Sequence, residues 1–266
     1  MATGLRLTAF GLILAGTFGT SYAVGEQLPG HSHSGSTTAG QSHSHSHDPA
    51  RPTTATTTSR GYQLVAMANG ADGTKVRFRV DDPDGKPVTE YTEAHGALLH
   101  TVLIRPDLSS FQHVHPTIGD DGTFEVDPGA PGQWRIIFET TPASTDSPIV
   151  LSTNVDDEAA VAEVPLPAPA DEVMLEVQGD TIVVTRSGTN FIVDAPQPLE
   201  PYLGQQAHLI AIRQGDLAYT HIHPGDPMTG MLMFSKAITE PGTYRMFLQF
   251  GYRGDVVTAA FTVVVQ

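Results

Sequence analysis

Apolar and polar positions alternate with a period of two over many short stretches of this chain, the pattern that half-buried strands show. Turn signals such as DPDG at 82–85 and DPG at 127–129 separate the stretches. We therefore predict an all-β protein whose strands lie within residues 62–70, 75–82, 98–106, 111–116, 123–127, 133–140, 149–155, 173–178, 181–188, 190–195, 206–214, 219–224, 230–238, 243–250 and 256–265.

The predicted strands fall into two sets that repeat the same sequence features. His100, His113 and His115 have the spacing His-x12-His-x-His, and His208, His221 and His223 have the same spacing. Downstream, PGQWRIIFE at 131–139 aligns with PGTYRMFLQ at 241–249. About seven strands per set, with a turn every 8–12 residues, predict two tandem immunoglobulin/cupredoxin-like β-sandwich modules. We place module 1 at 61–156, a Pro/Ala-rich linker at 157–170 and module 2 at 171–266.

The N-terminal segment differs from the rest of the chain in hydropathy. Residues 1–25 carry one basic residue, Arg6, followed by an uncharged apolar run, and Ser21-Tyr22-Ala23 fits a cleavage site. The segment is expected to be a signal peptide or a membrane anchor, and both alternatives place the rest of the chain outside the cytoplasm. Residues 26–60 are predicted to be a disordered Ser/Thr-rich tether that can capture metal weakly, with histidines at positions 31, 33, 43, 45 and 47.

Composition excludes several classes of function. The formal net charge is −15, which disfavours binding to nucleic acid and limits membrane contact to residues 1–25 if they are retained. Cysteine is absent, so the chain has no disulfide, no thiol nucleophile and no blue-copper centre.

The repeated histidine spacing has a geometric consequence. If residues 98–105 and 111–115 form a hairpin that turns near Asp107, His100 lies opposite His115 and Val102 opposite His113. His113 and His115 share one face of their strand, so all three imidazoles converge. The same arithmetic pairs His208 with His223 in module 2.

Three converging imidazoles suit a copper or zinc ion, whose identity the spacing leaves open. Glu139 and Gln249 are candidates for a fourth ligand because they occupy equivalent positions. Two alternatives remain. The histidines form a hydrogen-bonded network and the chain is a structural or interaction module without metal, or a three-histidine metalloenzyme site activates water or dioxygen. The apolar face of His208, Ile210 and Ile212 suggests that these rings lie partly inside a sandwich.

Other residues with metal-binding or catalytic chemistry carry weaker signals. His95 lies five positions before His100 and is expected on a surface loop, facing away from the site. Met228, Met231 and Met233 follow the second histidine pair; thioethers bind Cu(I), but alternation favours packing in the core. No nucleophile elbow, phosphate loop or catalytic triad pattern is present, so we expect a binding protein and not an enzyme.

The segment from PYLGQQAHLIAIRQGDLAYTHIHP to PGTYRMFLQFGYRGDVVTAAFTV resembles a domain of secreted or membrane-anchored, heavy-metal-associated proteins of actinobacteria. The resemblance implies an exported β-sandwich in which His208, His221 and His223 form the family's histidine pattern. In general plan the chain is also similar to periplasmic copper-handling sandwiches. We expect an extracytoplasmic protein that sequesters copper or zinc or hands it to another metal-handling protein.

Overall fold

The computed structural model describes residues 55–266 except 68–74, 157–160, 189, 226–230 and 235–237. The predicted leader at 1–25 and nearly all of the tether at 26–60 lie outside the described residues. Strands make up every regular element in the described part, which confirms the all-β prediction. None of those residues forms a helix with the length and hydrophobicity of a membrane span.

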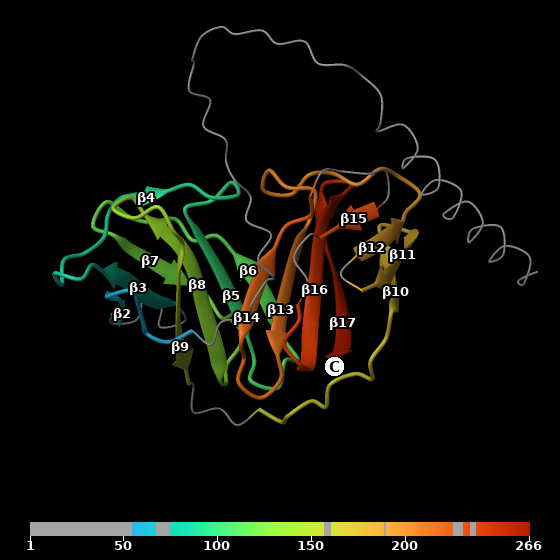
Figure 1. Ribbon diagram of the computed structural model, residues 1–266, viewed down its shortest axis with the longest axis horizontal. Coiled ribbons are helices and arrows are strands. Elements are labelled where there is room, and N and C mark those ends of the chain that lie inside the picture. The colour runs from blue at the N-terminus through green and yellow to red at the C-terminus, as the bar shows by residue number, and fades with distance from the viewer. Residues whose placement is uncertain (1–54, 68–74, 157–160, 189, 226–230, 235–237) are drawn as a thin grey trace, which may run out of the picture. The chain divides into compact units, whose positions relative to one another are not determined.

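Module 1 consists of two antiparallel sheets (Figure 1). The first has the order β1-β2-β3-β7, with β1 Thr58–Ser59, β2 Tyr62–Ala66, β3 Val76–Asp81 and β7 Thr123–Val126. The second has the order β4-β8-β5-β6, and β9 also pairs with β8; its strands are β4 Tyr91–Thr92, β5 Leu99–Ile104, β6 Phe111–Val114, β8 Trp134–Pro142 and β9 Ile149–Val155. Because β1 and the buried Ala55 belong to this module, it begins six residues before the predicted start at Gly61.

Module 2 repeats this plan. Its first sheet has the order β10-β11-β12-β15, with β10 Glu172–Val177, β11 Asp180–Ser187, β12 Asn190–Asp194 and β15 Met231–Met233. Its second sheet has the order β14-β13-β16-β17, with β13 His208–Arg213, β14 Tyr219–Ile222, β16 Gly242–Tyr252 and β17 Asp255–Val265. The sheets β6-β5-β8-β9 and β14-β13-β16-β17 are therefore equivalent, and the duplication predicted from sequence is present in the fold.

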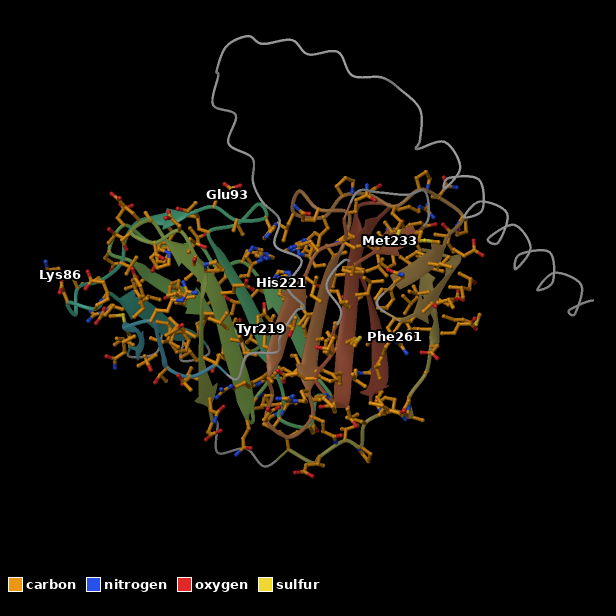
Figure 2. All side chains as sticks on the ribbon, in the orientation of Figure 1. Lys86, Glu93, Tyr219, His221, Met233 and Phe261 are labelled. Atoms are coloured by element: carbon orange, nitrogen blue, oxygen red, sulfur yellow. The ribbon has the colours of Figure 1, made fainter. Side chains whose placement is uncertain are left out.

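Three apolar clusters hold these sheets together. One lies inside module 1 and includes Phe78 and Phe138; a second lies inside module 2 and includes Phe261, labelled in Figure 2. The third lies between the modules and consists of Val102, Ile104, Leu108, Ile137, Ile210, Ile212, Tyr219 and Phe247. The rings of Phe111 and Phe247 stack across this third cluster, with centroids 3.9 Å apart. We call this contact the module interface.

The module interface explains why β5 and β13 are apolar on both faces. On β5, Leu99 and Leu103 pack into module 1, whereas Val102 and Ile104 pack against module 2. On β13, Leu209 packs into module 2, and Ile210 and Ile212 face module 1. The face of His208, Ile210 and Ile212 is buried, as its apolar character predicts, but it faces the other module instead of the interior of its own sandwich.

Candidate metal centre

The hairpin register that brings the histidines together is the predicted one. In module 1, Val102 pairs with His113, and in module 2 Ile210 pairs with His221. His115 and His223 each lie one residue beyond the end of a strand, β6 and β14 respectively. Figure 2 shows His221 and Tyr219 on β14. The two hairpins therefore present three imidazoles each, and both sets lie at the module interface.

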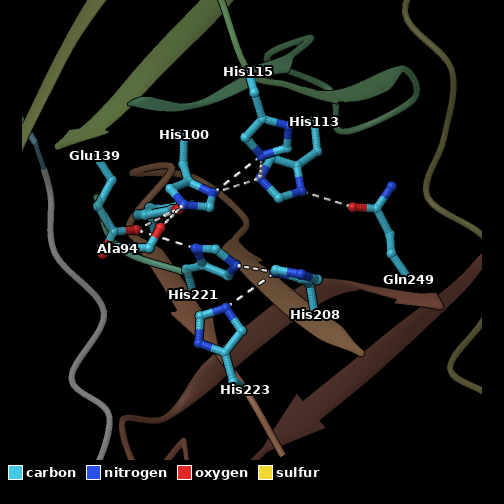
Figure 3. A network of polar contacts seen from close by, with 10 residues as sticks. Ala94, His100, His113, His115, Glu139, His208, His221, His223 and Gln249 are labelled. Atoms are coloured by element: carbon cyan, nitrogen blue, oxygen red, sulfur yellow. Dashed lines mark hydrogen bonds and ion pairs between the residues drawn. The ribbon is translucent and has the colours of Figure 1, made fainter. Parts of the chain in front are cut away.

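The three imidazoles of module 1 converge on one point, and we call them triad 1 (Figure 3). His100 Nδ1 lies 3.4 Å from His113 Nε2, and His115 Nε2 lies 3.1 Å from the first and 3.2 Å from the second. A tetrahedral ion with metal–nitrogen bonds of 2.0–2.1 Å separates its ligand atoms by about 3.3 Å. The nitrogens of triad 1 are therefore spaced as such an ion requires.

Triad 2 consists of His208, His221 and His223 and has the same arrangement. His208 Nδ1 lies 3.0 Å from His221 Nε2 and 3.0 Å from His223 Nε2. One nitrogen of each of the three rings lies within 4.8 Å of the others. The chain therefore contains two histidine triads that could hold a metal ion.

Acceptors on the outer side of four rings fix which nitrogen carries the proton. His100 Nε2 donates to the carbonyl oxygen of Ala94 at 2.9 Å, and His208 Nε2 donates to that of Tyr202 at 3.0 Å. A carbonyl oxygen accepts but cannot donate, so the inward Nδ1 of each neutral ring carries a lone pair. Metal-binding histidines are usually held from outside in this way, which sets their tautomer and orientation.

The outer partners of the other two rings come from the opposite module. His113 Nδ1 donates to Gln249 Oε1 at 2.8 Å, and the Gln249 amide in turn donates to Thr258. His221 Nδ1 donates to Glu139 Oε2 at 3.2 Å. Glu139 and Gln249 are candidates for a fourth ligand by their equivalent placement, but in the structure each contacts the outward nitrogen of a histidine in the other module. The reason is that the two sheets face each other, a contact that strand periodicity does not reveal.

These hydrogen bonds leave the inward nitrogens unprotonated, so that their lone pairs face each other. In triad 1 the lone pairs of His100 Nδ1 and His113 Nε2 meet, and a proton or a cation between them removes the repulsion. In the metal-free protein, His115 can supply that proton as its Nε2–H tautomer. Metal binding requires the other tautomer of His115, with its proton on Nδ1.

The surroundings favour the neutral form of five triad imidazoles, those of His113, His115, His208, His221 and His223. Burial, together with the nearby rings of His221 and His115, lowers the pKa of His113 to about 2. Burial also lowers the pKa of His115 and of His208 to about 4. For His221, whose side chain is 2% exposed, burial and then the neighbouring His208 and His100 lower the pKa well below 6.5, and His223 shifts the same way. Neutral imidazoles are the form that binds metal.

Two further groups lie beside the triads. Tyr219 OH donates to Glu139 Oε2 at 2.9 Å, and burial raises the pKa of Tyr219 well above its ordinary value, so the phenol remains a donor. The exposed ring of His95 lies over that of His223, with centroids 3.8 Å apart. The prediction that His95 faces away from the site is wrong, because the tight turn at 94–97 directs it back toward the cluster.

The methionine prediction also fails in part. Leu232 is the core residue of β15, whereas Met231 is half-buried and Met233 is 43% exposed, labelled in Figure 2. Met228 lies outside the described residues. The strand alternates as predicted, but with the opposite face buried.

Comparison with known domains supports the internal repeat. A family described as "Domain of unknown function (DUF8832)" matches residues 55–155 and, again, residues 168–266. The chain belongs to the DUF8832 family. Its two DUF8832 domains coincide with modules 1 and 2, and each contributes one histidine triad.

The other comparisons add no function. No curated protein matches the chain. Among solved structures, the crystal structure of residues 217–571 of S. aureus TarS is similar at 8% identity with a TM-score of 0.21. That match covers 74% of this chain and 61% of the TarS chain.

Proposed function

We propose that this DUF8832 protein is an extracytoplasmic metal-binding protein that holds copper or zinc at its histidine triads, for sequestration or for transfer to another protein. The observation that carries the proposal is the convergence of inward nitrogens 3.0–3.4 Å apart whose neighbours on the outer side are hydrogen-bond acceptors. Donor sets made of imidazole nitrogen suit zinc and copper. Zinc and divalent copper match this set better than Cu(I), because the described thioethers of Met231 and Met233 belong to a different sheet.

The hydrogen bonds that the nearby Glu139 carboxylate already accepts favour a binding protein over an enzyme. Glu139 accepts hydrogen bonds from both His221 and Tyr219, so it is already committed to orienting a ligand. A metalloenzyme would need a further acid or base next to the ion. The extracytoplasmic location rests on the apolar leader at residues 1–25.

The alternative is a metal-free cluster that only joins the modules. The bonds His113–Gln249 and His221–Glu139 cross the module interface and stabilise it without any ion. If this alternative holds, the parent chain carries only background metal, and replacing the half-buried histidines does not change that amount.

The test is metal analysis of the chain after zinc or copper loading and dialysis against a weak chelator. The five tether histidines are replaced by Ser in every protein, so that bound metal reports on the triads. The double variant H115A/H223A removes one half-buried ligand from each triad, and circular dichroism confirms that it folds. Structural zinc sites contribute about 10–16 kcal/mol over four ligands, so losing one ligand should weaken binding by at least ~100-fold.

The matched control is H95L, which removes an imidazole next to His223 and installs the residue that the equivalent turn of module 2 carries, Leu203. Loss of metal in the double variant with retention in the control supports the proposal. Equal metal content in the double variant and the parent chain, or no metal in the parent, contradicts it.

A further inference from the structure

The two triads are not separated from each other. Ring centroids within a triad lie 4.5–5.6 Å apart. Between triads, His100 lies 5.2 Å and His113 5.3 Å from His221, while His208 lies 5.7 Å from His113 and 6.4 Å from His100. The spacing between triads therefore overlaps the spacing within them, and the six imidazoles form one cluster.

Ligand atoms of the two modules also approach one another directly. Nitrogens of His100, His113 and His221 lie within 4.8 Å of one another, and these residues come from both modules. Figure 3 shows the triads facing each other across the interface. Two ions seated in the triads would thus be neighbours, and in two-metal sites a single small ligand can contact both ions when they lie about 3.5–4 Å apart.

Charge then limits what can occupy the cluster. Two divalent ions bring four positive charges into an interface lined by Val102, Ile137, Ile210 and Phe247, where electrostatic repulsion is weakly screened. The six imidazoles are neutral when they coordinate. In the described part of the chain, the carboxylate that bonds to a triad imidazole is that of Glu139. A neighbouring pair of divalent ions therefore needs a further anion between them.

We propose that the two triads form one dinuclear centre across the module interface, in which two divalent ions share a small bridging anion of the hydroxide class. The inference rests on the proposed metal binding and specifies the kind of centre that the bound ions form. Neither module contains the centre alone, because each supplies one triad and the outer partner of the other module's histidine. This dependence gives the duplication of the domain a physical role.

The two positions of the centre are unequal. His221 of triad 2 donates to a carboxylate, whereas its counterpart His113 donates to the neutral amide of Gln249. A carboxylate partner makes an imidazole a stronger donor to a metal, and losing such a partner typically weakens binding by 10–100-fold. Triad 2 is therefore expected to fill first, and Glu139→Gln should remove most of the difference.

Electron paramagnetic resonance tests the inference. The sample is the chain with the tether histidines replaced, and Cu²⁺ is added at one and at two equivalents. Bound copper is measured in parallel. At one equivalent the spectrum should integrate to one spin per chain. At two, the integrated intensity should fall well below two spins, or a half-field transition should appear, because the neighbouring ions couple. Acid denaturation should restore two spins, which excludes reduction to Cu(I).

Variants separate the outcomes. H223A leaves triad 1 intact and should bind one uncoupled copper ion, whereas H95L should match the parent in bound copper and in spin count. Two bound ions with two full, uncoupled spins, or saturation at one ion per chain, would overturn the dinuclear centre while leaving metal binding established. A parent chain that binds no copper would instead overturn the proposed function itself.

Discussion

Acid should destabilise the metal-free protein through its buried neutral imidazoles. An unfolded histidine takes up a proton below pH 6.5, whereas burial holds the pKa of folded His113 at about 2 and that of His221 well below 6.5. The unfolded state therefore binds more protons, and the free energy of unfolding decreases as the pH falls below 6.5. At pH 5 the loss is about 2 kcal/mol for His113, and His221 adds a further loss of the same sign.

That loss is large beside the ~5–15 kcal/mol by which domains are usually stable. The assay is urea unfolding in the presence of a chelator at pH 8 and pH 5, for the parent chain and for H113Q/H221Q. The double variant lacks the two titrating groups, so its unfolding free energy should depend less on pH by at least about 2 kcal/mol, the part due to His113, over this interval. The same pH dependence in both proteins would show that the fold does not hold these imidazoles neutral.

Three further predictions concern the module interface and its surroundings. Phe247→Ala removes the ring stacked on Phe111 and should lower the free energy of unfolding by about 3–5 kcal/mol in urea; a loss below 1 kcal/mol would mean that the interface is not packed. His95→Leu should leave the bound metal unchanged but slow its transfer to a chelator in stopped-flow absorbance, because an exposed imidazole next to His223 is lost; an unchanged rate would exclude His95 from the exchange route. Gly96 and Gly85 both have φ of +79°, but an added Cβ at Gly96 would lie 3.0 Å from the Leu203 carbonyl oxygen. G96A should therefore lower the melting temperature more than G85A. Equal shifts would show that the turn at Gly96 does not contact the turn at Leu203.

Local rules were sufficient to predict each hairpin. The loop length and the alternation of β5 and β6 set the pairing of Val102 with His113, and the same rules paired Ile210 with His221. The convergence of three rings in each module followed from that register. It could be predicted because hairpin geometry depends on residues close together in sequence.

The module interface could not be predicted in this way. A strand that is apolar on both faces indicates burial on both sides, but it does not say what covers the second face. For this reason the pattern places the face of His208, Ile210 and Ile212 partly inside one sandwich, and it offers Glu139 and Gln249 as candidate ligands without showing which histidines they contact. Their true partners, His221 and His113, lie 82 and 136 residues away in sequence.

His95 was missed for a different reason. Strand periodicity predicts the side of a residue only while the strand continues, and the chain turns sharply between Ala94 and Ala97. The positive φ of His95 and Gly96 marks this turn, and Leu203 and Gly204 repeat it in module 2. The His95-Gly96 pair was the available signal, since a glycine after a turn residue is typical of such tight hairpin turns.

The most direct measurement is a crystal structure of the zinc-loaded protein with an anomalous difference map at the zinc absorption edge. If the triads bind metal, anomalous peaks will lie about 2.0–2.1 Å from the inward nitrogens of His100, His113 and His115 and of His208, His221 and His223. Ordered imidazoles without an anomalous peak among them, in crystals whose zinc is bound elsewhere, would contradict metal binding by the triads.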